Sequence, residues 1–312
     1  MHIDLLIVLA GLIVGFTVGL TGMGGGALMT PILVLLFGIQ PLAAVSSDLV
    51  ASLVARPFGA LVHIRRKTVR WDLVRYLCIG SVPAAFAGVF VLKALGNGKQ
   101  LENGVKIGLG IALLVASATI VVKGLFQLRQ WGRDRRLERA GIVPPPPRVL
   151  RLKPVPTMLI GVGGGLVVGM TSVGSGSLII VLLLLLYPSL QASRLVGTDL
   201  VQAVPLVAAA SLGHLLFGDF KLGLTTSLVL GNIPGVYLGA KVSTKAPAGL
   251  VRRALLLVLV ASGLKLLNVS TLDLAWILGV GAIAGPFLWM AARRANGLSA
   301  RPPRLSEFVS AQ

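Results

Sequence analysis

Long apolar stretches, separated by short polar segments, run along most of the chain. Residues 275–292 contain no charged residue, residues 107–122 are nearly as long, and residues 254–267 are interrupted only by Lys265. A bilayer-spanning helix needs about 18–20 consecutive, mainly apolar residues. The pattern therefore predicts several transmembrane helices, and the fold class that we expect is an all-α polytopic membrane protein.

The polar segments set the expected limits of the spans. Residues 5–20 are expected to form a retained helix rather than a cleaved signal peptide, because no basic segment precedes them. Residues 156–187 form a further apolar stretch with glycines near its middle. The other expected spans are residues 74–95, 104–122, 192–217, 222–240, 250–267 and 272–291.

The pattern repeats once along the chain. One set of residues recurs in the same order 150 positions later, and after a one-residue slip the matches continue at a spacing of 151. Asp48 then matches Asp199, and His63 matches His214. Ordered matches of Asp and His are hard to produce by chance, so the sequence indicates two related halves. The first set is Gly11, Gly15, Gly19, Thr21, Gly24, Gly26 and Leu28.

Charged residues are few and mostly basic. They make up 12% of the chain, with 29 Lys and Arg against 10 Asp and Glu, and the net charge is +19. Soluble domains carry roughly 25% charged residues. Most of the basic residues lie in loops between apolar runs, as in cytoplasmic loops of membrane proteins, and few aromatic residues accompany them. This distribution favours a bilayer and argues against nucleic acid as a partner.

The basic loops predict the topology. Loop 63–75, the Pro-rich segment 123–155, the loop near 241–253 and the tail 293–312 are all expected to be cytoplasmic. All four segments can be cytoplasmic only if residues 156–187 enter and leave the membrane on the same side. The expected location is the inner membrane of a cell, with the linker and the tail in the cytoplasm.

Clustered glycines supply the required breaks. Gly174-Ser175-Gly176 interrupts the stretch 156–187, and Gly24-Gly25-Gly26 lies at the equivalent place in the first half. Glycine weakens a helix by about 1 kcal/mol relative to alanine and permits positive φ. We therefore predict two broken-helix hairpins, each followed by three transmembrane helices.

Three spans per half is an odd number, so the second half is predicted to be inverted relative to the first. Inverted repeats with broken helices at corresponding positions are typical of secondary transporters, whose substrates bind near the bilayer midplane. The predicted division is 1–122 (first repeat), 123–155 (basic linker), 156–267 (second repeat), 268–292 (one extra C-terminal helix) and 293–312 (tail).

Three sets of glycines have the four-residue spacing of close helix packing, and packing is the interpretation that we favour for them. Such glycine faces can pack helices of one chain or of two chains, so a homo-oligomer remains possible. The sets are Gly11, Gly15 and Gly19; Gly161, Gly165 and Gly169; and Gly231, Gly235 and Gly239.

The pattern GxxGxGGGxLxxPxLxxxxGxxPxxA at residues 19–44 resembles that of the sulfite exporter TauE/SafE family of membrane permeases. The second half resembles the family's second copy, including the region of His214 and residues 231–235. The resemblance covers about residues 5–267. It implies a permease for a small sulfur-containing or carboxylate anion, often moved outward. Ser175 and Val181 depart from the pattern, which has glycine and proline at these places.

An anion inside a membrane needs donors that replace its water. The N-terminus of a helix offers free backbone N–H groups and a partial positive charge, and the second helix of each hairpin begins after a glycine cluster. We therefore expect the two breaks to form the anion site. The candidate residues are Thr21, Gly24, Gly25, Gly26, Arg56, Thr171, Ser172, Gly174, Ser175, Gly176 and Ser177.

Asp48 and Asp199 lie within apolar segments, where a carboxylate is costly and is either functional or paired. Proton coupling and a structural role, in which each carboxylate accepts hydrogen bonds from a helix end, both remain open. Arg56 has no counterpart in the second half, and it either contacts the anion or pairs with an acid. His63 and His214 lie at segment ends, where a solvated or helix-capping histidine is expected. Gln202, Ser52 and Asn232 are further candidates for polar lining.

Other classes of protein fit the sequence less well. With three histidines and ten acidic residues, no metal cluster or catalytic motif is apparent, so we expect neither an enzyme nor a cofactor. The alternative function is a membrane-embedded sensor or assembly partner without transport activity. The sequence as a whole favours a secondary transporter, an exporter of an anion such as sulfite or a sulfonate, that works by alternating access.

Overall fold

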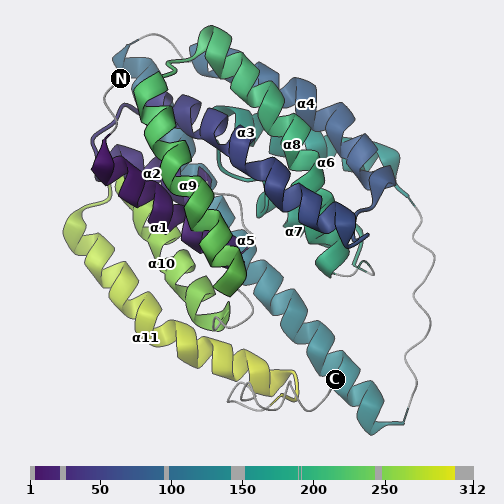
Figure 1. Cartoon of the computed structure of the whole chain (residues 1–312). Helices are drawn as coiled ribbons and strands as arrows, with labels where there is room; N and C mark the ends of the chain where they lie inside the picture. Colours follow the sequence, from purple (N-terminus) through teal and green to yellow (C-terminus); the bar gives the residue numbers. More distant parts are fainter. Residues whose placement is uncertain are drawn as a thin grey trace.

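The computed structural model of the chain describes residues 4–21, 26–94, 98–141, 152–188, 190, 192–242 and 248–298. Every regular element in these residues is an α-helix (Figure 1). The helices of the first half are α1 (Leu5–Thr21), α2 (Gly26–Leu35), α3 (Pro41–Arg65), α4 (Trp71–Ala94) and α5 (Lys99–Arg139). Those of the second half are α6 (Pro154–Thr171), α7 (Leu178–Leu186), α8 (Ala192–Phe217), α9 (Leu222–Val242) and α10 (Ala248–Leu266), followed by α11 (Thr271–Ala295).

The all-helical polytopic class is confirmed. Among the described residues, seven helices are long and apolar enough to cross a membrane. The order of elements also agrees with the sequence, since each half has two short helices and then three longer ones, with one helix added at the end. Proline at the start of α3 and of α6 suits the first turn of a helix, where the N–H is not needed.

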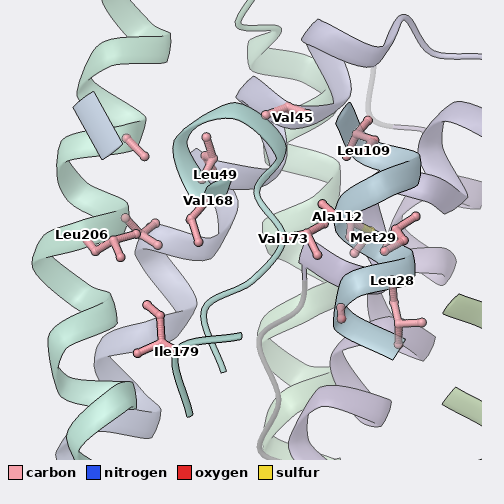
Figure 2. Packing of buried hydrophobic residues seen from close by; sticks show 14 of the residues in the cluster. Leu28, Met29, Val45, Leu49, Leu109, Ala112, Val168, Val173, Ile179 and Leu206 are labelled. Carbon is pink, nitrogen blue, oxygen red and sulfur yellow. The ribbon is translucent and has the colours of Figure 1, made fainter. Parts of the chain in front are cut away.

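The two halves pack reciprocally. Helix α1 packs on α9, and its counterpart α6 packs on α4. Helix α3 packs on its own counterpart α8, and α5 packs on α10. A large hydrophobic cluster fills the space between these pairs, and Figure 2 shows part of it around Leu49, Val168 and Ile179.

Helices α3 and α8 run in opposite directions. Ser46 near the start of α3 is hydrogen-bonded to His214 near the end of α8, with 2.8 Å between Oγ and Nδ1. At the other ends of both helices, Gly197 lies against His63. Equivalent helices of the two halves are thus antiparallel at the centre of the molecule.

The predicted glycine packing is confirmed. Along α6, added Cβ atoms at Gly161 and Gly165 would overlap the backbone carbonyls of Leu77 and Ser81 on α4. Along α9, the glycines approach the backbone of α1 in the same way. Only glycine permits such close contact between helix backbones.

Replacing Gly165 by alanine is expected to lower the thermal stability of the protein, because the new methyl group would overlap the Ser81 carbonyl. Overpacking of this kind costs about 1–3 kcal/mol. The matched control is Gly163→Ala on the same helix, where a Cβ meets nothing within 4 Å and alanine should stabilise the helix. Thermal unfolding in detergent measures both, and equal melting temperatures for the two variants would contradict the packing described.

The first part of the linker is helical. Residues 123–139 were expected to belong to the basic linker that follows the first repeat, and α5 continues through them to Arg139 and extends out of the bundle (Figure 1). The helix ends at Arg139, just before Gly141, which has a positive φ of 63°, and the first proline of the segment is Pro144. Gly124 contacts Trp289 of α11 and Gly132 contacts Asn296, which holds this extension against the C-terminal helix.

Candidate functional site

The break of the second half comprises residues 172–177, between α6 and α7. Ser172, Gly174 and Gly176 all have positive φ, at 59°, 122° and 94°. The two glycines adopt these conformations without steric cost, whereas a non-glycine residue at φ 59° carries a penalty of about 1–2 kcal/mol. The glycine cluster therefore reverses the chain within a few residues, as predicted.

Several donors of this break have no acceptor in the part of the chain that the structure describes. Ser175 is buried, and its hydroxyl has no hydrogen-bond partner among the described residues. Within the same part of the chain, no hydrogen bond uses the backbone N–H of Gly174 or Ser175. Buried donors without partners are costly, so this end of α7 is suited to an acceptor from outside the chain.

The start of α2 meets the break of the second half. Gly26, the first residue of α2, lies directly against Ser172, and a Cβ at Gly26 would overlap the Ser172 carbonyl. The first-half candidates Gly24 and Gly25 lie outside the described residues, as does the side chain of Thr21. The start of α2 and the break of the other half nevertheless share one buried region.

Asp48 of α3 joins these parts. Its Oδ2 accepts hydrogen bonds from the hydroxyl of Ser172 at 2.7 Å and from that of Thr30 on α2 at 3.1 Å. The side chain is almost completely buried, at 1% exposure. Two hydroxyl donors replace water for the carboxylate, and they tie α2 and α3 to the break of the second half.

Asp199 of α8 has a different environment. Its Oδ1 accepts one hydrogen bond, from Gln202 Nε2 at 3.3 Å, and the backbone N–H of Gly176 faces the carboxylate. Its Oδ2 is buried with no partner among the described residues. Gln202 is held in turn by Ser81 of α4, whose hydroxyl donates to Gln202 Oε1 at 3.2 Å. The two equivalent carboxylates therefore differ in how fully their oxygens are hydrogen-bonded.

Arg56 lies between the two acids. Its guanidinium interacts electrostatically with Asp199 and, less strongly, with Asp48. Its Nε and Nη2 atoms are buried, and neither has a hydrogen-bond partner in the described part of the chain. A guanidinium is always charged and has five donors, so the free ones are available to an anionic oxygen.

Of two further candidate hydroxyls, that of Thr171 bonds its own helix end and that of Ser177 does not cap α7. The Thr171 hydroxyl donates to the Val167 carbonyl at 2.6 Å and accepts from the N–H of Val173 at 3.2 Å, which closes the end of α6. Ser177 precedes α7, but its side chain makes no capping hydrogen bond. These contacts give Thr171 a structural position at the edge of the break.

His214 is fully buried rather than solvated, and both ring nitrogens have partners. The helix-capping alternative agrees with the structure, because Gly169 lies in the last turn of α6 and His214 bonds its carbonyl. Its Nε2 lies 2.7 Å from the Gly169 carbonyl, which can only accept, so Nε2 carries the hydrogen. His63 is half-buried, and its Nδ1 lies 2.9 Å from the hydroxyl of Thr68 in the following loop. The two equivalent histidines thus have unequal environments.

The sequence did not single out Thr30, Ser46 or Ser81, although all three are completely buried. Thr30 and Ser81 each donate a hydrogen bond to a residue far away in the chain. One signal was available, because Thr30 is the only side chain with a hydrogen-bonding group in α2. Of the candidates for lining, Gln202 joins the Asp199 cluster, whereas Asn232 lies against Gly15 of α1.

Comparison with known proteins agrees with this architecture. The family model described as "Sulfite exporter TauE/SafE" matches residues 7–266. The chain is similar to "Probable membrane transporter protein YjnA" of Bacillus subtilis (strain 168), with 38% identity over 262 residues that cover 84% of this chain and 98% of that protein. "Probable membrane transporter protein YdhB" and "Probable membrane transporter protein YunE" of the same organism are each 24% identical, over 84% of this chain and 100% and 96% of theirs. No solved structure matches the chain significantly.

Proposed function

Because this chain belongs to the sulfite exporter TauE/SafE family, we propose that it is a secondary transporter that exports a small anion such as sulfite or a sulfonate. The anion binds where the break at residues 172–177 meets the start of α2, beside Arg56. A transporter family also supports the expectation that the chain is not an enzyme. The protein crosses the membrane several times, and we assign it to the inner membrane with its basic linker and tail in the cytoplasm.

One observation carries this proposal. Arg56 places buried guanidinium nitrogens, which have no hydrogen-bond partner among the described residues, between the two halves. A permanent positive charge is costly there unless an anion or an acid lies close to it. Asp48 is already bonded to two hydroxyls, and Asp199 makes one long hydrogen bond with Gln202 instead. The free donors of Arg56, together with the amides of Gly174 and Ser175, match an oxyanion.

The antiparallel arrangement of α3 and α8 supports inverted-topology repeats. In such a transporter, rocking of one half against the other exposes a central site to each side in turn. The site proposed here lies between the halves, since Asp48 and Ser172 come from different ones. Alternating access then needs no large change within either half.

Counterflow in proteoliposomes tests the function. Vesicles preloaded with unlabelled sulfite or ethanesulfonate should accumulate the labelled anion transiently when they contain the protein, and protein-free vesicles should not. A membrane-embedded sensor or assembly partner would bind without any counterflow. Binding without counterflow for both anions would therefore favour that alternative.

A further inference from the structure

The two acids at equivalent positions of the halves are not equivalent in their hydrogen bonding. Asp48 Oδ2 accepts from Ser172 and Thr30, at 2.7 and 3.1 Å. Asp199 Oδ2 is equally buried but has no partner among the described residues, and its Oδ1 has a single long bond, at 3.3 Å from Gln202. The two aspartates occupy equivalent positions of the sequence repeat, but their hydrogen-bonding environments suit two different roles.

An ionised carboxylate inside a membrane is stable only if donors or cations replace its water. Asp48 has such donors whether or not another group approaches it. Asp199 accepts a long hydrogen bond from Gln202 and the backbone N–H of Gly176 faces it, but its Oδ2 has no partner among the described residues. The cations that face it are Arg56 from α3 and Lys123 from α5. A change in the charge around Arg56 should therefore affect the ionisation of Asp199 more than that of Asp48.

Arg56 links Asp199 to the anion site. The guanidinium interacts electrostatically with Asp199 more strongly than with Asp48, and its Nε and Nη2 are free to bind an oxyanion. An anion bound there shares the positive charge that otherwise balances Asp199. An unbonded carboxylate oxygen next to a newly bound anion is the natural place for a proton, because like charges at short range disfavour ionisation of both.

We propose, on the basis of the anion-transport function above, that Asp199 is the proton carrier of this transporter and that Asp48 is a structural carboxylate. When an anion binds at Arg56, Asp199 Oδ2 takes one proton from the water on the open side. Both the anion and the proton leave on the opposite side, and Asp199 is again ionised and paired with Arg56. A monovalent anion then crosses the membrane without net charge movement, and the protein exports it whenever the outward concentration ratio of the anion exceeds the inward concentration ratio of protons.

This assignment separates Asp199 from Asp48 in a direct experiment. The probe is labelled ethanesulfonate, which keeps its single negative charge over the working pH range, in proteoliposomes with imposed pH gradients or valinomycin–potassium potentials. The wild-type protein should accumulate the probe in response to an inward proton gradient and should ignore the membrane potential. Asp199→Asn, which is permanently neutral, should lose the response to protons and respond to an inside-positive potential instead.

Asp48→Asn is the matched control, because it removes the same charge from the equivalent position of the other half. Whatever its rate, the transport that remains should still follow the proton gradient. Retained proton coupling in Asp199→Asn, or loss of coupling in Asp48→Asn alone, would overturn the assignment. Wild-type protein that moves no ethanesulfonate and no sulfite would instead overturn the transport function, so the two failures are distinguishable.

A second measurement covers the case in which Asp199→Asn does not fold. Ethanesulfonate added to purified wild-type protein in weakly buffered detergent solution should raise the pH, as one proton is taken up with each anion that binds. Protein with anion binding but without proton uptake would contradict a carrier at Asp199.

Discussion

Replacing Arg56 by glutamine is expected to weaken anion binding by at least about a hundredfold. Each hydrogen bond from a charged donor contributes about 1.5–3 kcal/mol, and two such bonds are lost, so about 3–6 kcal/mol is at stake. Every 1.4 kcal/mol or so is a factor of ten in Kd. The affinity for sulfite or ethanesulfonate, measured by equilibrium binding to the purified protein, checks this expectation.

Two further variants make the result specific. Arg56→Lys keeps the charge but not the forked geometry, so its affinity should lie between those of the wild type and the glutamine variant. Arg65→Gln, on the exposed last turn of the same helix, removes the same charge away from the site and should bind normally. Thermal unfolding must show folded protein in each case, because loss of Arg56 removes the cation that faces Asp48 and one of the two cations that face Asp199. Equal affinities for wild type and Arg56→Gln would remove Arg56 from the site.

Replacing Gly26 by valine is expected to destabilise the protein and to abolish transport. A Cβ at this position would overlap the carbonyl and crowd the hydroxyl of Ser172, so the start of α2 would be pushed away from the second break. Overpacking a tight site costs about 1–3 kcal/mol, and losing the hydrogen bond from Ser172 to Asp48 adds about 1.5–3 kcal/mol. Thermal unfolding and counterflow measure the two effects.

Gly59→Val is the control for that change. Gly59 lies on α3, where an added Cβ meets nothing within 4 Å, and valine has a somewhat higher helix propensity than glycine, so the free energy of unfolding should change by less than about 1 kcal/mol. If Gly26→Val were as stable and as active as Gly59→Val, the start of α2 would not be in contact with the second break as described.

The helices and the second break could be predicted because their causes are local. Apolar length gives the spans, and the glycines at 174 and 176 adopt the positive φ values that the reversal needs. The end of α5 could not be placed in the same way, because many charges also occur on a helix that leaves the bilayer. There the start of the proline run at Pro144 was a better indicator than charge.

The partners of the buried polar residues could not be predicted, because they come from distant parts of the chain. Asp48 and Ser172 are 124 residues apart, and Ser46 and His214 are 168 apart. The repeat gave the correct expectation that Asp48 and Asp199 are related positions, but it also suggested that they have one role. The contacts of Asp48 break that equivalence, since it alone has Thr30 from its own half and Ser172 from the other half as partners.

The most direct test of the account concerns access to the break itself. Cys78 is the only cysteine, so a Cys78→Ser, Ser175→Cys protein carries a single thiol in the proposed anion site. The anionic reagent sulfonatoethyl methanethiosulfonate should label this thiol in both right-side-out and inside-out vesicles, and ethanesulfonate should slow the labelling from either side. Labelling from one side only, or labelling that the anion does not slow, would contradict an alternating-access anion site at residues 172–177.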